Sequence, residues 1–228
     1  QLLEVDRWML ARTAQLQAEI VGERDERGVY VGGFYGRNEF HPVVSRLQVF
    51  CSEDLGAFWL DLLKDRLYTT AADSRARRSA QTALHQVAQT LLRWMAPMLS
   101  FTAEEVTQMT RPGGSVFTET FTDTTGWADE ALLARWARIR AVRELANKEI
   151  ETLRAAGGVG ASLQAEITIT APPDDHALLA SLGDDLRFVT ITSKATLRPG
   201  DALAVAVSAS SAPKCGRCWH YPVSYTHL

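Results

Sequence analysis

The chain has 228 residues, of which 46% are hydrophobic and 22% are charged, and its formal net charge is −3. Such a composition belongs to a folded chain of one large or two modest domains and excludes an intrinsically disordered protein. No run approaches the roughly 20 apolar residues of a membrane-spanning helix, and the small net charge provides no overall attraction for nucleic acid.

The arginine and cysteine content is more informative about binding partners and compartment than the total charge is. The chain has 20 arginines but only 4 lysines, and arginine suits phosphate groups and stacked bases better than lysine does. A GC-rich genome would produce the same bias. The three cysteines are Cys51 and the close pair Cys215 and Cys218. This spacing is not that of a secreted disulfide framework and favours a reducing, cytoplasmic compartment.

Residues 1–155 show apolar side chains at helical spacing, and this pattern predicts a mainly α fold. We expect helices over residues 2–21, over 43–66, from the N-cap Asp73 to Pro97, from a capping box at Thr102 and Glu105 onward, and over about 127–155. Between the first two helices, residues 29–35 predict a short hairpin that turns on Gly32 and Gly33.

Several large side chains fall on the apolar stripes of these helices. We expect Trp8, Trp59 and Trp136 in the core, and Cys51 as a buried, inert thiol. Trp219 stands beside the cysteine pair, so we expect it to pack against that loop. There is no glycine-rich phosphate loop, no nucleophile elbow and no paired carboxylates, so nothing in the chain resembles a catalytic centre.

The pattern changes after residue 156, where apolar and polar residues alternate over 163–170 as in a half-buried strand. We expect a short helix over 177–182 that Asp174 or Asp175 caps, and further strands over 186–192 and 202–207. Residues 156–208 are therefore predicted to form a small α+β module. A linker of small residues separates this module from the cysteine pair.

Cys215 and Cys218 have the spacing of two thiolate ligands of one tetrahedral zinc ion, with Gly216 allowing the tight loop. The pair supplies two ligands of four. His220 and His227 are the other candidates, but His220 follows Cys218 too closely for the usual ligand spacing. A redox pair normally opens a helix, whereas this pair follows a serine-rich linker. Zinc binding, redox chemistry and no function at all remain alternatives.

Cationic residues gather around the start of the predicted third helix. Guanidinium groups bind phosphates in a bidentate way or stack on unpaired bases, and cations at a helix N-terminus oppose the helix dipole. The alternative is a solvated helix face with local ion pairs. The candidate tRNA-binding residues are Lys64, Arg66, Arg75, Arg77, Arg78 and Arg93.

Three stretches closely resemble the isoleucyl-tRNA synthetase family of bacterial type, in the family's order. They are FCS at 50–52 with DLLKDRLYT at 61–69, DSRARRSAQTAL at 73–84 with RWMAPMLSFTAEE at 93–105, and CGRCWHY at 215–221. Residues 183–189 and 192–193 also look like the family. The resemblance covers nearly the whole chain, and the combination of motifs is specific, since valyl and leucyl relatives share the bundle but not the final motif.

The resemblance implies part of a class I synthetase that joins isoleucine to its tRNA with ATP and Mg²⁺ in a catalytic domain outside this chain. Residues 1–155 would be the anticodon-binding helical bundle and residues 156–208 a second tRNA-facing module. Residues 212–222 would be the first half of a four-cysteine zinc motif, with Cys215 and Cys218 as its first pair. The expected partner is isoleucine-accepting tRNA, with neither DNA nor a membrane, and the chain alone is expected to be inactive.

The chain departs from the family pattern in several places. The second cysteine pair is absent, so the zinc knuckle is incomplete, and residues 223–228 look like a non-native tail. Residues 22–38 are longer than the family's connection and are interpreted as an added surface loop. The first residues are already in helical register without Met, as in a piece of a longer protein. The alternatives are a free-standing zinc-knuckle RNA-binding protein with a helical scaffold and a thiol oxidoreductase.

Overall fold

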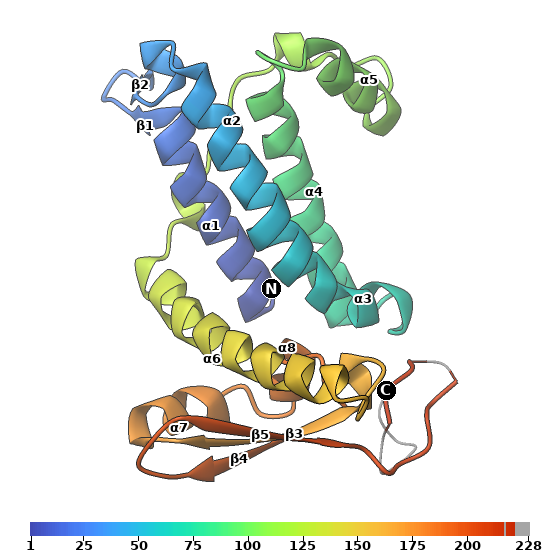
Figure 1. Cartoon of the computed structure of the whole chain (residues 1–228). Helices are drawn as coiled ribbons and strands as arrows, with labels where there is room; N and C mark the ends of the chain where they lie inside the picture. Colours follow the sequence, from blue (N-terminus) through green and yellow to red (C-terminus); the bar gives the residue numbers. More distant parts are fainter. Residues whose placement is uncertain (217, 222–228) are drawn as a thin grey trace. The chain divides into compact units, whose positions relative to one another are not determined.

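The computed structural model describes residues 1–216 and 218–221 and divides into two compact units, Gln1–Leu133 and Ala134–Leu228 (Figure 1). The first unit consists of helices and a small hairpin, and the second combines helices with a three-stranded sheet. No helix among the described residues is both long enough and apolar enough to cross a membrane.

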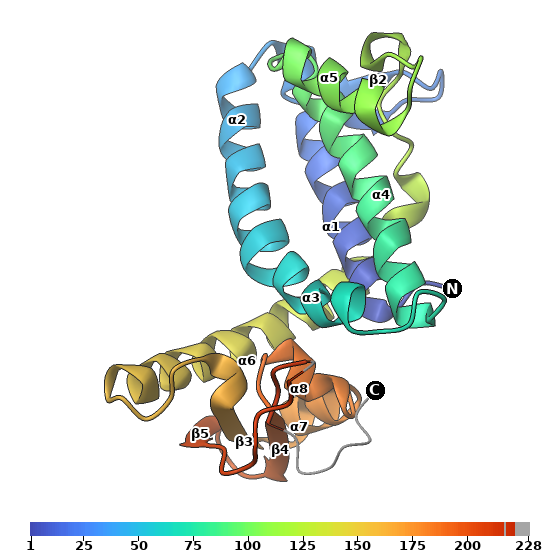
Figure 2. The same cartoon turned by 90° about the vertical axis from the view of Figure 1, so that its right-hand side faces the viewer.

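Helices dominate the first unit, which confirms the expected mainly α fold. The unit contains α1 (Glu4–Ile20), α2 (Phe40–Val49), η2 (Phe50–Leu60), α3 (Asp61–Tyr68), α4 (Arg75–Met95) and α5 (Ser100–Thr110), with the short turns η1 (Tyr35–Arg37), η3 (Val116–Thr118) and η4 (Thr125–Trp127). α1 packs against α4, and these two helices lie side by side in Figure 2.

The helix predicted over 43–66 is confirmed, but it is longer and has an unexpected middle. α2, η2 and α3 follow one another without a break from Phe40 to Tyr68, and η2 has the wider turns of a π-helix. A Cβ at Gly56 would lie 3.1 Å from the carbonyl oxygen of Cys51. The missing side chain at Gly56 therefore suits the wide turn, which the apolar spacing does not reveal.

Tryptophan and phenylalanine side chains fill the core of the first unit, and each is at most 2% exposed. The rings of Trp8 and Phe58 meet edge to face at 5.0 Å, and those of Phe50 and Trp94 at 5.9 Å. The core placement predicted for Trp8 and Trp59 is thus confirmed, and Trp136 in the long helix that follows is also buried.

Cys51 does not belong to this core, so the prediction of a buried thiol was wrong. Cys51 is exposed, whereas its neighbour Phe50 is fully buried. Adjacent residues of a helix point in different directions, and Phe50 takes the inward position. The surrounding protein nevertheless removes enough water to raise the pKa of the Cys51 thiol above its usual range.

The predicted hairpin exists, but its turn lies elsewhere. β1 (Gly22–Arg24) pairs antiparallel with β2 (Tyr30–Gly32), so residues 25–29 form the turn and Gly32 ends the second strand. The Asp25 carboxylate accepts hydrogen bonds from the backbone N–H groups of Arg27 and Val29, each at 2.9 Å. This Asx turn determines the register.

The capping box at Thr102 was a wrong prediction, because α5 already begins at Ser100. Its N-cap residue is Leu99, which makes no side-chain cap. The Ser100 hydroxyl donates to the carbonyl oxygen of Ala96 at 2.8 Å, so the turn that ends α4 leads directly into α5. α4 likewise takes Ser74 as its N-cap rather than Asp73, with the Ser74 Oγ accepting from the N–H of Arg77 at 3.2 Å.

The second unit is built on the long helix α6 (Glu130–Ala155) and a sheet. The remaining elements are η5 (Ser162–Gln164), β3 (Ala165–Ala171), α7 (Pro173–Ala180), α8 (Asp185–Val189), β4 (Lys194–Pro199) and β5 (Ala204–Ala209). β3 is the central strand, parallel to β4 and antiparallel to β5. Val142, Ala146 and Ile150 of α6 form one core with Ile167 and Ile169 of β3, which confirms the strand predicted over 163–170.

Two local predictions in this unit were wrong. Residues 186–192 are not a strand, because Leu186 and Val189 are buried three residues apart on one face of α8, and the strand β4 follows at Lys194. Neither Asp174 nor Asp175 caps α7, whose N-cap is Pro172. Asp175 instead accepts a hydrogen bond from Arg138 Nε at 2.7 Å, and this bond lowers the pKa of its carboxyl group.

Candidate nucleic-acid interface

A tight turn joins α3 to α4 and holds the start of α4 in place. The Thr70 hydroxyl donates to the carbonyl oxygen of Arg66 at 2.6 Å, and the Ser74 hydroxyl donates to Thr70 Oγ1 at 3.0 Å. Because the N–H of Arg77 in turn donates to Ser74 Oγ, hydroxyl groups close the end of α3 and open α4. The local sequence thus fixes the positions of the cations on both sides of the turn.

Four of the six predicted cationic residues lie at this turn, and we refer to Lys64, Arg75, Arg77 and Arg78 as the basic corner. Lys64, Arg75 and Arg78 are exposed, and Arg77 is half-buried with one guanidinium N–H donating to the carbonyl oxygen of Thr70 at 3.3 Å. Lys64 forms an exposed ion pair with Asp61 at 2.5 Å. Arg75 reaches only a backbone carbonyl, that of Gln1, at 3.4 Å, so its charge stays accessible to an anion in solution.

Arg66 turns inward and serves a buried carboxylate. Its side chain is 17% exposed and lies 3.5 Å from a carboxylate oxygen of Asp6, which is fully buried in α1. Asp6 also accepts hydrogen bonds from Trp59 Nε1 at 3.1 Å and from the Ser79 hydroxyl. Burial raises the pKa of Asp6, although these partners oppose the shift. Arg66 is therefore a counter-ion in the core of the bundle.

Arg93 lies at the other end of α4 and also forms an ion pair. Its guanidinium group and that of Arg111 both pair with the carboxylate of Glu119. Burial alone would raise the pKa of Glu119, but the two arginines outweigh it, so the pKa is lowered. The structure thus brings four of the six candidates together and places Arg66 and Arg93 in separate ion pairs.

This pair of arginines predicts how stability depends on pH. Because the folded-state pKa of Glu119 is lowered, its ion pairs stabilise the fold above the unfolded-state pKa near 4.5, and the stabilisation is lost as the pH falls through the folded-state pKa. We expect Glu119→Gln to lower the urea midpoint at pH 7 and the difference from wild type to shrink as the pH falls below 4.5. Glu105→Gln, which changes an exposed carboxylate of α5, is the control. A difference that does not shrink as the pH falls below 4.5 would contradict the prediction.

Sequence reasoning missed Tyr68, the last residue of α3. Its side chain is 81% exposed and lies at the turn that carries the basic corner. An exposed aromatic ring among cations is a typical platform for an unpaired base. The sequence could have revealed this exposure. Leu62 and Leu63 mark the buried face of α3, and Tyr68 falls outside that face.

The cysteine pair forms a compact turn in the second unit. The N–H of Trp219 donates to the carbonyl oxygen of Cys215 at 3.1 Å, and the N–H of Cys215 donates to that of His220 at 2.8 Å. Cys218 is buried and Cys215 is half-buried. Trp219 was expected to pack against the loop, but its side chain is 62% exposed. The centre of its indole ring lies 5.3 Å from Nζ of Lys214.

The two thiols are fewer than the four donors that a tetrahedral zinc site takes. Within residues 1–216 and 218–221, no three His, Cys, Asp or Glu side chains converge to hold a metal ion. Two thiols held by one turn fit the first pair of a four-ligand site, and nothing in the described part adds a third ligand. Arg217, His227 and the expected non-native tail 223–228 lie outside the described residues.

Comparison with known proteins adds to this geometry. The model of the family described as "Anticodon-binding domain of tRNA ligase" matches residues 6–169. The chain belongs to this family. The match covers most of the chain, including the whole of the α3–α4 turn.

The relatives with known names are all isoleucine–tRNA ligases in the three cases that follow. The chain is 52% identical to the isoleucine–tRNA ligase of Bordetella pertussis over 97% of its length, and 55% identical to that of Thiobacillus denitrificans over 96%. It is 51% identical to the isoleucine–tRNA ligase of Ralstonia pickettii over its full length. In each case the chain spans 23% of the relative. The resemblance that the motifs predicted is thereby confirmed for an anticodon-binding domain of bacterial isoleucine–tRNA ligase type.

Proposed function

We propose that the chain is the tRNA-binding part of a bacterial-type isoleucine–tRNA ligase and that it binds isoleucine-accepting tRNA. The similarity to isoleucine–tRNA ligases along nearly the whole chain, within an anticodon-binding family, carries this proposal. The relatives are about four times as long as the chain, as follows from the 23% that it spans. Joining isoleucine to tRNA with ATP and Mg²⁺, in the cytoplasm, is then the work of the longer parent protein.

The basic corner supports a role in docking RNA. Its guanidinium groups bind phosphate oxygens in a bidentate way, and each neutralised phosphate releases counter-ions, so binding weakens as the salt concentration rises. Single-stranded loops expose base edges that the deep groove of duplex RNA hides. In this proposal the corner grips the backbone of the anticodon arm while its unpaired bases meet exposed rings such as Tyr68. Arg66 and Arg93 support the same surface indirectly, by holding the bundle that carries it.

The experiment that tests the function compares transcripts. The chain is titrated with an isoleucine-accepting tRNA transcript and with an unrelated tRNA of equal length at several salt concentrations. We expect tighter binding of the isoleucine transcript at every salt concentration. Equal affinity for both transcripts would refute the assignment, even if both bind.

Tyr68→Ala tests the stacking role separately. Removing a ring that stacks on one base costs about 1–3 kcal/mol of binding, which corresponds to a loss of tRNA affinity of roughly 5- to 150-fold. Because the ring is 81% exposed, the free energy of unfolding should change by less than about 0.5 kcal/mol. Tyr68→Phe should retain most of the affinity. If the alanine variant binds as tightly as wild type, Tyr68 makes no stacking contact.

We also propose that Cys215 and Cys218 contribute the first two ligands of a zinc site in the parent protein. Zinc there would serve as a structural cross-link, since thiolate-rich sites without an open position hold a fold together. The zinc content of the parent protein, measured after dialysis, should fall when Cys215→Ser and Cys218→Ser are combined, whereas Cys51→Ser should leave it unchanged. Equal zinc content in both variants would refute the assignment.

A further inference from the structure

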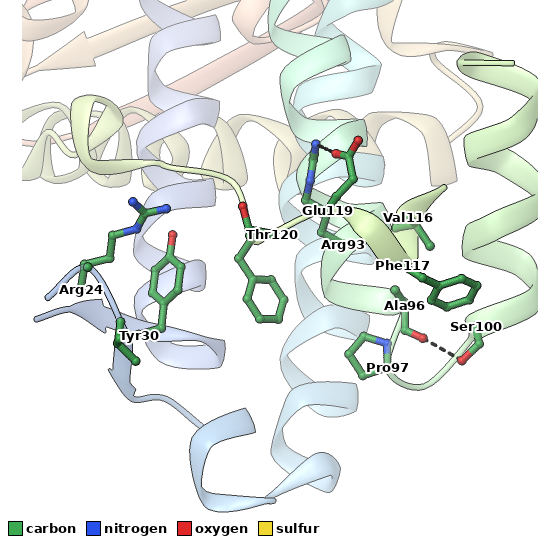
Figure 3. A pocket seen from close by; sticks show the side chains of 13 residues that line it. Arg24, Tyr30, Arg93, Ala96, Pro97, Ser100, Val116, Phe117, Glu119 and Thr120 are labelled. Carbon is green, nitrogen blue, oxygen red and sulfur yellow. Dashed lines mark hydrogen bonds and ion pairs between the residues drawn. The ribbon is translucent and has the colours of Figure 1, made fainter. Parts of the chain in front are cut away.

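A cavity of about 850 Å³ lies in the first unit, at the opposite end of α4 from the basic corner. The β1–β2 hairpin, the junction of α4 with α5, and the segment 116–121 line it, and it opens to solvent (Figure 3). Its volume lies within the range of sites that bind small molecules, roughly 300–1,000 Å³.

Positive charge is in excess around this cavity. Arg24 and Arg93 line it, and Glu119 is the one carboxylate among the described lining residues. Glu119 already pairs with Arg93 and with Arg111, so it cannot neutralise Arg24 as well. Arg24 interacts with the Tyr30 side chain and forms a long ion pair, 3.7 Å, with Asp123, whose side chain is 60% exposed. Because a guanidinium group carries five N–H donors, Arg24 keeps donors for an anionic group of a ligand beside these two partners.

Aromatic rings form the apolar part of the wall. The guanidinium group of Arg24 lies over the Tyr30 ring at 4.9 Å from its centre. Phe121 packs against two other rings, since the centre of its ring lies 6.0 Å from those of Tyr30 and Tyr35. Phe117 is different, because it is 60% exposed. In Figure 3, Arg24 and Tyr30 stand on one side of the cavity and Phe117 on the other, with Thr120 between them.

We propose that this cavity binds a nucleoside 5′-monophosphate unit, with its base against Phe117 and its phosphate beside Arg24. A nucleotide combines a planar apolar face with an anion, and the cavity presents an exposed ring opposite an available guanidinium group. The shared chemistry has two sources, a free nucleotide or an unpaired nucleotide of an RNA strand. The RNA source rests on the proposed function, which is tRNA binding. A free nucleotide does not require that function, because the cavity lies apart from the basic corner.

The test titrates the 228-residue chain with adenosine 5′-monophosphate and with adenosine, using calorimetry. We expect the monophosphate to bind and adenosine to bind more weakly. Phe117→Ala should weaken binding of the monophosphate about tenfold, as the removal of one stacked ring does. The matched control is Phe101→Ala, which removes a ring of α5 that is 94% exposed and lies outside the cavity lining.

Arg24→Ala provides a second, independent variant. It should reduce the affinity for the monophosphate to that for adenosine, because the phosphate loses its partner. Circular dichroism should show the fold of each variant intact, since the Phe117 side chain is 60% exposed and the Arg24 side chain 37%. No binding of the monophosphate at millimolar concentration, or equal effects of Phe117→Ala and Phe101→Ala, would overturn the proposal.

Competition distinguishes the two sources. Single-stranded oligoadenylate that displaces the monophosphate from wild type, but not from Phe117→Ala, identifies RNA as the source. Oligoadenylate that fails to compete identifies a free nucleotide. Both outcomes support the site. tRNA affinity is measured on the same chain, so an absence of monophosphate binding with intact discrimination between transcripts overturns this inference and leaves the proposed function standing.

Discussion

Trp59→Ala is expected to lower the free energy of unfolding by about 3–5 kcal/mol, the range for deleting a large buried aromatic side chain. Trp59 is fully buried, so its removal leaves a void that the helices around it fill only partly. The loss has a second part, because Trp59 Nε1 donates to the buried Asp6 carboxylate. Without this donor, Asp6 keeps only Ser79 and the more distant Arg66 as partners.

Urea denaturation followed by circular dichroism measures this loss, and a second substitution separates its two causes. Trp59→Phe restores most of the volume but not the indole N–H, so it should lose about 1.5–3 kcal/mol, the range for a hydrogen bond to a charged group. Trp219→Ala, at a tryptophan that is 62% exposed, should change stability by less than about 0.5 kcal/mol. If Trp59→Ala is no more harmful than Trp219→Ala, the core does not depend on Trp59.

Removing the exposed cations of the basic corner is expected to have the largest effect on RNA binding. The triple variant Lys64→Ala, Arg75→Ala, Arg78→Ala eliminates three charges that are exposed on either side of the α3–α4 turn. Each phosphate that is no longer neutralised should reduce the slope of log affinity against log salt by about 0.7–0.9. At about 1 kcal/mol for each of these phosphates, the affinity for tRNA should fall roughly 100-fold at low salt.

A control with matched charge makes this prediction specific. Arg154→Ala combined with Arg198→Ala and Lys194→Ala also removes three positive charges, but from the second unit. Filter binding over a series of salt concentrations, with curves for both variants, gives the affinities and slopes. If the two triple variants reduce affinity and slope equally, total charge rather than the corner governs binding. The thermal midpoint of the corner variant should stay close to that of wild type, because these side chains are exposed.

The apolar periodicity predicted the helices of the first unit. It did not predict the local features that depend on contacts between distant residues. The helix over 43–66 follows from its apolar spacing, but the wide turns of η2 depend on how Phe50 and Trp59 enter the core. The interpretation of residues 186–192 as a strand failed because Val189 and Ile191 alternate with threonines as in a strand, whereas Leu186 and Val189 are spaced as on one face of a helix. The packing of Leu186 against β3 and α6 favours the helix α8. The hairpin was misplaced for a different reason, since the Asp25 side chain makes a turn that composition does not show.

Charge patterns were equally incomplete as a guide to the candidate interface. The sequence places six cations along α3 and α4, but it does not show which of them face a carboxylate that is distant in sequence. Arg66 meets Asp6, far earlier in the chain, and Arg93 meets Glu119 from a loop. Lys64, Arg75 and Arg78 remain exposed. Local spacing therefore identified the right segment, and only the folded chain separates surface cations from buried counter-ions.

The position of β3 in the sheet has a consequence for synthesis on the ribosome. β3 is the central strand, yet both of its partners, β4 and β5, come later in the chain. While translation proceeds, β3 emerges with two open edges, and the core that α6 shares with the sheet stays incomplete until residue 209 has left the exit tunnel. Unpaired edges and exposed apolar surface favour aggregation. A nascent chain that stalls before Ala204 should therefore need chaperone protection that the completed sheet no longer requires.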